Sequence, residues 1–254
     1  MGILDGKNIL ITGVLSYSSI AFEVARVAQD EGAEVVLTSY GRRSLVERVA
    51  ARLPKPPPVV DLDVTDTEQL DSLAERVGVH LDGLDGVLHA VAFAPPGALG
   101  GAFLRTAWED AATTLQVSTF SLQALSTAVL PMLRPGSAIV AMDYDDGGAF
   151  PSYDWMGVAK SGLESCARYL AYYLGPNRVR VNLVAAGPLW SVAASHIPGF
   201  KDSLVDWDER APLGWRPDDR TAVARACAAL LSDWFPATTG EIVHVDGGRH
   251  AMGH

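Results

Sequence analysis

Two residues seven positions apart, Tyr153 and Lys160, form the pattern with the clearest chemical meaning in this sequence. In a helix, this spacing places both side chains on one face, about 10 Å apart along the axis. A phenol can donate a hydrogen bond to a carbonyl oxygen on which negative charge develops, and a nearby ammonium favours the ionised phenol. The same ammonium can bind the hydroxyl groups of a ribose. Taken alone, the pair can also be a packed tyrosine and a lysine that faces solvent.

A second pattern, at the end of the first expected strand, is typical of phosphate binding. Gly13 is followed by Ser16, Ser18, Ser19 and Ile20, which lead into a helix. The pyrophosphate of a dinucleotide binds free backbone N–H groups at the start of a helix, where glycine allows a close approach. Only one glycine is present here, although the small serines can supply space and hydroxyl donors. An ordinary strand-to-helix turn is the alternative.

The third expected strand ends in Asp63 and Val64, at the sheet edge where an adenine ring commonly lies. Asp63 can accept a hydrogen bond from the adenine amino group or cap the strand end, and the sequence leaves both roles open. Thr65 and Glu68 have the spacing of a capping box, which predicts that a helix begins there.

The hydrophobic pattern indicates the elements that must position these residues. Short runs of Val, Ile and Leu alternate with stretches of helical period, as expected for parallel strands covered on both faces. The expected strands are 8–12, 34–39, 59–62, 86–91, 138–142, 179–184 and 241–245. We therefore predict an α/β fold, a single-domain Rossmann-like doubly wound sheet of about seven parallel strands over residues 1–254, with helices on both faces.

One long segment, 187–215, follows a strand and shows no clear regular structure. Long loops in compact domains usually carry function, and ligands bind beyond the carboxyl ends of the strands in such sheets. We therefore expect this segment to bind substrate.

Composition excludes several classes of protein. The chain has 254 residues, of which 48% are apolar, and its net charge of −10 disfavours binding to nucleic acid or to an anionic membrane. The six histidines show no paired metal spacing, so no metal site is expected. The two cysteines, Cys166 and Cys227, are expected to be buried thiols. The N-terminal residues lack the pattern of a signal peptide, and we expect a cytoplasmic protein.

Together these motifs resemble the enoyl-acyl-carrier-protein reductases, a divergent branch of the short-chain dehydrogenase/reductase fold. The sequence is most similar to the actinobacterial subgroup that includes the mycobacterial enzyme of mycolic-acid synthesis. The resemblance covers nearly the whole chain, including segments 183–189, 231–234 and 239–248. Ordinary short-chain dehydrogenases place tyrosine four residues before lysine, where this chain has Met156. The wider spacing is typical of the enoyl reductase branch.

The resemblance implies hydride transfer from NADH to the β-carbon of a trans-2-enoyl thioester on acyl carrier protein, in a homotetramer. Tyr153 would stabilise the thioester oxygen, Lys160 would hold the nicotinamide ribose, and Tyr144 matches an aromatic catalytic-site position near the substrate. The implied cofactor-binding residues are Gly13, Ser19, Ile20, Tyr40, Asp63, Val64, Val91, Ala92, Lys160, Leu189 and Ser191. The implied substrate-binding residues are Ala94, Tyr153 and Met156.

Several residues depart from the pattern of the family. Ala92 stands where the family has glycine, which would strain a backbone with positive φ. Segment 187–215 is shorter than in the mycobacterial long-chain enzyme, which predicts a shorter acyl chain. Arg42 and Arg43 follow Tyr40 near the expected adenosine site and can accept a 2′-phosphate, so the sequence is also compatible with NADPH.

Two other functions are compatible with the sequence. A related reductase that modifies a specialised metabolite, with an enoyl or keto thioester as substrate, would explain two departures. One is Ala92, and the other is the segment before Tyr153, which lacks the family's arginine and has Gly147 and Gly148 there. A non-catalytic NAD(P)-binding regulator is the alternative from another class, but it would need neither Tyr153 nor Lys160.

The acidic net charge has a consequence for the expected partner. Acyl carrier protein is itself acidic, so the two proteins would repel each other unless a local basic surface lies beside the substrate entrance. Lys201, Arg210 and Arg216, in or bordering segment 187–215, are the candidates for that surface.

Overall fold

Seven parallel strands form one sheet in the computed structural model, which describes residues 1–144, 148–192 and 194–253. The strands are β1 (Asn8–Ile11), β2 (Glu34–Ser39), β3 (Val59–Asp61), β4 (Leu84–His89), β5 (Leu133–Asp143), β6 (Arg180–Ala186) and β7 (Ile242–Val245). Their order is β3-β2-β1-β4-β5-β6-β7. All seven expected strands are confirmed, and the order reverses direction between β1 and β4, where ligands bind in doubly wound sheets.

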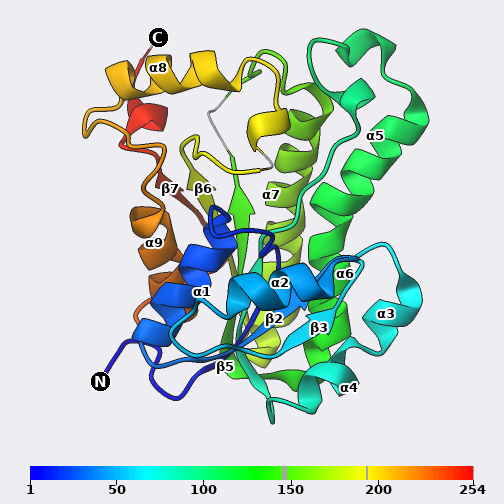
Figure 1. The fold of residues 1–254 in the computed structure, drawn as a ribbon, viewed down its shortest axis with the longest axis vertical. Coiled ribbons are helices and arrows are strands. Elements are labelled where there is room, and N and C mark those ends of the chain that lie inside the picture. The colour runs from blue at the N-terminus through cyan, green and yellow to red at the C-terminus, as the bar shows by residue number, and fades with distance from the viewer. Residues whose placement is uncertain (145–147, 193, 254) are drawn as a thin grey trace.

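Helices cover both faces of this sheet (Figure 1). They are α1 (Ile20–Asp30), α2 (Arg43–Ala50), α3 (Thr67–Asp71), α4 (Leu73–Gly78), α5 (Trp108–Leu115), α6 (Ser121–Val129), α7 (Asp154–Leu174), α8 (Phe200–Arg210) and α9 (Thr221–Leu231). A single turn of π-helix, Gln116–Phe120, joins α5 to α6. Among the residues that the structure describes, no helix combines the length and the apolar composition needed to cross a membrane.

Two apolar cores lie on opposite faces of the sheet. Ile9 and Ile11 of β1 pack into the core that α1, α2 and α9 complete, while Leu10 packs into the core of α4, α6 and α7. Because successive side chains of a strand point to opposite faces, β1 is buried on both sides. This double burial explains why its sequence is an unbroken apolar run.

Three expectations about the elements need correction. The helix after β3 begins at Thr67, and Asp66 caps it by accepting a hydrogen bond from the Gln69 N–H, so the Thr65 capping box is wrong. Segment 187–215 contains α8 and is therefore not devoid of regular structure. Cys227 is fully buried, as expected, but Cys166 is only partly buried.

Candidate active site

The predicted site residues gather beyond the carboxyl ends of the strands. In the parallel register, Ile11 pairs with Leu88, and Asp143 pairs with Ala185, so the strands end at the same edge of the sheet. Figure 1 shows α8 beyond that edge, on the side toward which the strands run. The link from β1 to α1 and the segments that follow β4, β5 and β6 therefore face one region.

Gly13 brings the first two of these segments together. Its φ is +86°, and a Cβ at this position would lie 2.0 Å from the Ala90 carbonyl oxygen. Beside it, the Thr12 hydroxyl donates to the Leu88 carbonyl and accepts from the Ala90 N–H, both at 3.0 Å. Only glycine fits this close approach of two backbones. The first role of Gly13 is thus to join the end of β1 to the segment that contains Val91 and Ala92.

The start of α1 provides the features that a pyrophosphate needs. Ser19 precedes the helix, and its hydroxyl accepts from the N–H groups of Leu15 (3.1 Å) and Ser16 (3.0 Å). Its side chain therefore shapes the turn and does not cap the helix. The N–H groups of the first turn of this 11-residue helix, starting at Ile20, and its dipole favour an anion there.

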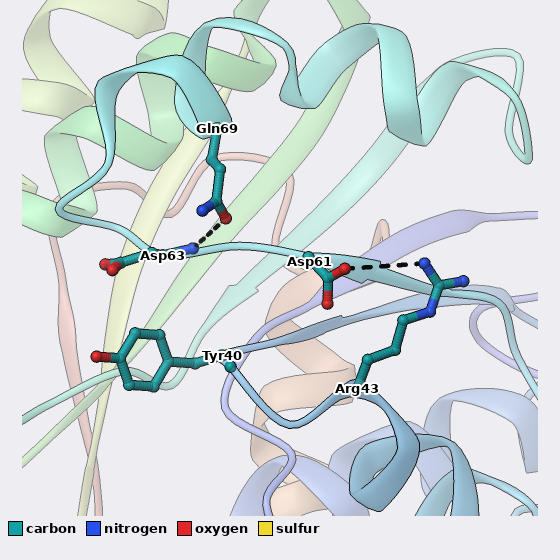
Figure 2. Close-up of a pocket in the computed structure, with 6 residues that line it drawn as sticks. Tyr40, Arg43, Asp61, Asp63 and Gln69 are labelled. Atoms are coloured by element: carbon teal, nitrogen blue, oxygen red, sulfur yellow. Dashed lines mark hydrogen bonds and ion pairs between the residues drawn. The ribbon is translucent and has the colours of Figure 1, made fainter.

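A cavity of about 390 Å³ lies at the ends of β2 and β3 (Figure 2). It is lined by Tyr40, Gly41, Arg43, Asp61, Asp63 and Gln69. The Tyr40 and Asp63 side chains extend to one side of Figure 2, and Arg43 and Asp61 lie on the other. An aromatic ring, a carboxylate acceptor and a hollow of this size suit an adenosine group, and Val64, which follows Asp63, is buried beside them.

The two roles left open for Asp63 coexist in the structure. Its Oδ1 accepts from the Thr65 N–H (2.8 Å) and the Thr65 hydroxyl (2.7 Å), so Asp63 does stabilise the turn after the strand. Its own N–H donates to the Gln69 side chain at 2.8 Å. The same carboxylate lines the cavity, where it can also accept from a ligand.

Lys160 is buried, contrary to the alternative in which it faces solvent. It is 7% exposed, and its Nζ donates to the Met142 carbonyl at 2.8 Å. Burial lowers the pKa of this ammonium, and the nearby Asp143 carboxylate acts in the opposite direction. A buried lysine on α7 is thus tied to the end of β5, at the carboxyl edge of the sheet.

Tyr153 lies directly before α7, two helical turns from Lys160, inside an apolar cluster. It is 8% exposed, and its ring centroid is 5.2 Å from that of Tyr144. The predicted substrate residues Ala94 and Met156 belong to the same cluster. The cluster also contains Leu99, Leu115, Phe150 and Ile197, which the sequence analysis did not assign to the site. The structure therefore brings together all residues predicted to contact the substrate.

The backbone around Tyr153 is strained and firmly held. Ser152 and Asp154 adopt positive φ angles of 68° and 45°. The Ser152 carbonyl accepts from the Gly100 N–H (2.9 Å), and the Asp154 carboxylate accepts from the N–H groups of Gly101 (2.6 Å) and Ala102 (3.0 Å). Strain of this kind persists where surrounding contacts enforce it, commonly at active sites. Segment 100–102 thus fixes the direction of the tyrosine.

Two tryptophans, Trp207 and Trp215, pack the segment after β6 beside the apolar cluster that contains Tyr153. The Trp207 ring lies 5.8 Å from the Tyr144 ring, and its indole N–H donates to the Asp246 carbonyl at 2.9 Å. The Trp215 indole donates to the Pro188 carbonyl at 2.7 Å. A Cβ on Gly187 would lie 2.7 Å from the Trp215 ring and 2.9 Å from the Trp207 nitrogen. Both tryptophans were missed because no local pattern indicates which tertiary contacts they make.

The remaining predicted cofactor residues occupy the same edge. Leu189 is buried after β6, and the Ser191 hydroxyl accepts from the Ala194 N–H at 3.0 Å. After β4, the Ser118 hydroxyl accepts a hydrogen bond from the Phe93 N–H (3.0 Å) and donates one to the Phe93 carbonyl (2.9 Å). Ala92 does not adopt a positive φ, so the strain expected there is absent.

His89 is a buried residue of the site that the sequence analysis did not single out. Its Nε2 lies 2.8 Å from the Ser121 hydroxyl, which itself donates to the Val117 carbonyl, so Nε2 is the donor. Burial, together with the charge of Lys160, lowers the pKa of His89 to about 3. The ring is therefore neutral at physiological pH. The sequence signal was a polar residue within an apolar strand.

Arg220 joins two of the predicted cofactor segments. Its Nε donates to the Ser18 carbonyl at 2.7 Å, in the link between β1 and α1. Its Nη2 donates to the Trp190 carbonyl, in the segment after β6. One guanidinium thus connects the turn that would hold a pyrophosphate to the segment that contains Leu189 and Ser191.

The comparisons with known proteins agree with this arrangement. A family model described as Enoyl-(Acyl carrier protein) reductase matches residues 13–250, which include every predicted site residue. The chain belongs to this family.

Individual members of the enoyl-acyl-carrier-protein reductase family align over almost the whole chain. The chain is 46% identical to an enoyl-acyl-carrier-protein reductase (NADH) of Mycolicibacterium smegmatis over 261 residues, 97% of each chain. Its identity to the corresponding Mycobacterium avium protein is 45% over 260 residues, with the same coverage of 97%. A Staphylococcus aureus relative, an enoyl-acyl-carrier-protein reductase (NADPH), is 37% identical over 253 residues and 98% of each chain. The named relatives thus differ in their nicotinamide cofactor.

Proposed function

We propose that this chain reduces the trans-2 double bond of an enoyl thioester carried by acyl carrier protein, with NADH as the hydride donor. The observation that carries the proposal is the burial of Tyr153 and Lys160 two turns apart, with Tyr153 in the same apolar cluster as Tyr144. Family membership supports it, and the NADH named for the mycobacterial relatives supports the choice of cofactor. Residues 1–254 would form one catalytic domain.

The residues of the site fit a nicotinamide dinucleotide. The cavity beside Tyr40 and Asp63 would receive adenosine, and the start of α1 would receive the pyrophosphate. The other cofactor-binding residues would be Gly13, Ser19, Ile20, Val64, Val91, Ala92, Lys160, Leu189 and Ser191. When bound, the nicotinamide would supply a hydride to the β-carbon of the substrate, and the α-carbon would take up a proton to complete the reduction.

The protein's own contribution would be to stabilise charge and to orient the reactants. The Tyr153 phenol would donate to the thioester oxygen as negative charge develops there, in surroundings that exclude water. Lys160, fixed by its bond to the Met142 carbonyl, would hold the ribose hydroxyls of the cofactor. Tyr144 packs against Tyr153 and would limit the positions open to the thioester.

Segment 187–215 would bind the acyl chain and the carrier protein. Ile197 of this segment packs against the cluster that contains Ala94 and Met156, so the segment contributes an apolar side chain to that cluster. Lys201 and Arg210 are exposed on α8. Together with Arg216 they would be the cationic contacts of an acidic carrier protein, although α8 itself carries four carboxylates to its two cations.

We also propose that the protein is a cytoplasmic homotetramer. Its support is the family, together with aromatic side chains that α7 leaves exposed. Tyr169, Tyr172 and Tyr173 are between 66% and 74% exposed in the single chain, and large exposed apolar surfaces commonly mark interfaces.

The test is to follow NADH absorbance with crotonyl and longer trans-2-enoyl thioesters, each on acyl carrier protein and on CoA. We expect turnover, with preference for the carrier-bound form. Tyr153→Phe should lower kcat by about 100-fold, the effect of removing one donor to an oxyanion, and leave the Kd for NADH within about twofold. Tyr172→Phe removes the hydroxyl of an exposed tyrosine on the same helix but keeps the aromatic ring proposed for subunit contact; it is the matched control and should change neither quantity.

Two results would contradict the proposal. Binding of NADH without turnover of any thioester would favour a nucleotide-binding regulator. Loss of NADH affinity in Tyr153→Phe would show that the phenol binds the cofactor and does not act on the substrate.

A further inference from the structure

An ion pair lies at one end of the cavity that would receive adenosine (Figure 2). Arg43 Nη1 is 3.9 Å from Asp61 Oδ2, and Arg43 Nε donates to Glu47 at 2.8 Å. The guanidinium therefore faces two carboxylates. The sequence analysis offered Arg42 and Arg43 as binders of a 2′-phosphate; of the two, Arg43 lines the cavity and is already engaged in this ion pair.

The sheet itself fixes the position of Asp61. The register of β2 and β3 pairs Ser39 with Asp61, and the buried Ser39 hydroxyl donates to Asp61 Oδ1 at 2.6 Å. Arg76 of α4 donates to the Asp61 carbonyl. Because α2 begins at Arg43, soon after β2 ends, the same register also brings Arg43 beside Asp61. The ion pair is thus a consequence of the strand pairing.

The charges of the lining disfavour a phosphate. Asp61 and Asp63 oppose the single guanidinium of Arg43 among the residues that line the cavity. A 2′-phosphate carries up to two negative charges, so it would be repelled by both carboxylates and would have to displace Asp61 from Arg43. A ribose hydroxyl meets neither penalty, since a carboxylate can accept its hydrogen bond.

We infer that Asp61 is the residue that makes this protein select NADH over NADPH, by occupying Arg43 and by repelling a 2′-phosphate. The inference rests on the proposed function, because it assumes that the cavity receives the adenosine of a nicotinamide dinucleotide. It assigns opposite roles to two neighbours, since Arg43 alone would favour the phosphate.

The test measures binding directly, by calorimetric titration of the intact protein with NADH, NADPH, ADP and 2′,5′-ADP. The unchanged protein should bind NADH more tightly than NADPH. Asp61→Asn should lower the Kd for NADPH and for 2′,5′-ADP by about tenfold, because one opposing charge is lost and Arg43 is released. The Kd for NADH and ADP should change by less than about threefold, because an amide can still accept the bond from Ser39.

Two further variants separate this effect from a general change of charge. Adding Arg43→Gln to Asp61→Asn should remove the gain in NADPH affinity. Glu75→Gln alters the net charge equally at an exposed position of α4 outside the cavity lining, and should leave the NADPH-to-NADH ratio of Kd values unchanged. The thermal midpoint of each variant verifies that it is folded. We expect Asp61→Asn to fold, because the Asp61 side chain is 52% exposed.

The outcomes distinguish this inference from the proposed function. If neither dinucleotide binds the unchanged protein, the proposed function and the inference both fail. If NADH binds but Asp61→Asn leaves the ratio unchanged, or if the gain persists without Arg43, the inference alone is wrong. Equal affinity of the unchanged protein for NADH and NADPH would also overturn it.

Discussion

Replacing Gly13 by alanine tests whether this glycine serves the fold or the cofactor. The new Cβ would lie 2.0 Å from the Ala90 carbonyl oxygen, whereas Cβ atoms essentially never approach within 3.0 Å. The end of β1 and the segment after β4 would have to separate. That separation would weaken the bond between the Thr12 hydroxyl and the Ala90 N–H.

The expected destabilisation follows from these contacts. A positive φ costs alanine about 1 kcal/mol, overpacking against a backbone atom adds about 2 kcal/mol, and the weakened hydrogen bond adds about 1 kcal/mol. The free energy of unfolding should therefore fall by about 4 kcal/mol, with a decrease of roughly 10 °C in Tm. Gly6→Ala is the control, because Gly6 also has a positive φ (+72°) but no atom within 4 Å of the new Cβ. It should cost only about 1 kcal/mol.

Urea unfolding without any ligand, monitored by circular dichroism, measures both variants. If Gly13→Ala is no less stable than Gly6→Ala but binds NADH weakly, the glycine serves the ligand and the packing argument is refuted. A large loss of stability in the absence of ligand supports the packing role.

Two other predictions concern Arg220 and Asp246. Arg220→Ala should raise the Kd for NADH about fivefold, because the turn after β1 loses its connection through Arg220 to the segment around Trp190. Arg225→Ala, at an exposed position of α9, is the control and should leave this Kd unchanged. Burial raises the pKa of Asp246, but hydrogen bonds from the N–H groups of His250 and Gly248 and from the His250 ring lower it on balance. The ionised carboxylate therefore stabilises the fold above about pH 4, and this contribution disappears as pH falls through its lowered pKa. Asp246→Asn should lower the free energy of unfolding in urea by about 2 kcal/mol at pH 7 and by markedly less at pH 3. An equal decrease at both pH values would contradict this.

The strands could be predicted because burial on both faces requires continuous apolar runs, as in β1. The start of α3 could not, because Thr65 and Asp66 are both good capping residues and the Asp63 carboxylate binds the Thr65 hydroxyl. Helix α8 was missed because its sequence is largely polar, and the tertiary contact of the buried Trp207 leaves no local signal in the sequence.

Some residues of the candidate site could likewise be predicted from the sequence, and others could not. Tyr153 and Lys160 could be predicted from their spacing and the family resemblance, although their burial required the structure. The pairing of Asp61 with Arg43 depends on the register of two strands, and the bond of Arg220 to Ser18 joins positions 202 residues apart. Contacts of this kind leave no periodic signal in a single sequence.

The bonds of Arg220 to Ser18 and Trp190 have a thermodynamic consequence for how strongly the binding of two ligands is coupled. A dinucleotide that favours one arrangement of the link between β1 and α1 would also favour one arrangement of the backbone around Trp190, in segment 187–215, which is proposed to bind the acyl chain. Linkage requires this effect to be mutual, so a bound thioester would tighten the dinucleotide by the same factor. In Arg220→Ala the two ligands should bind more independently, so the Kd for each should depend less on whether the other is bound.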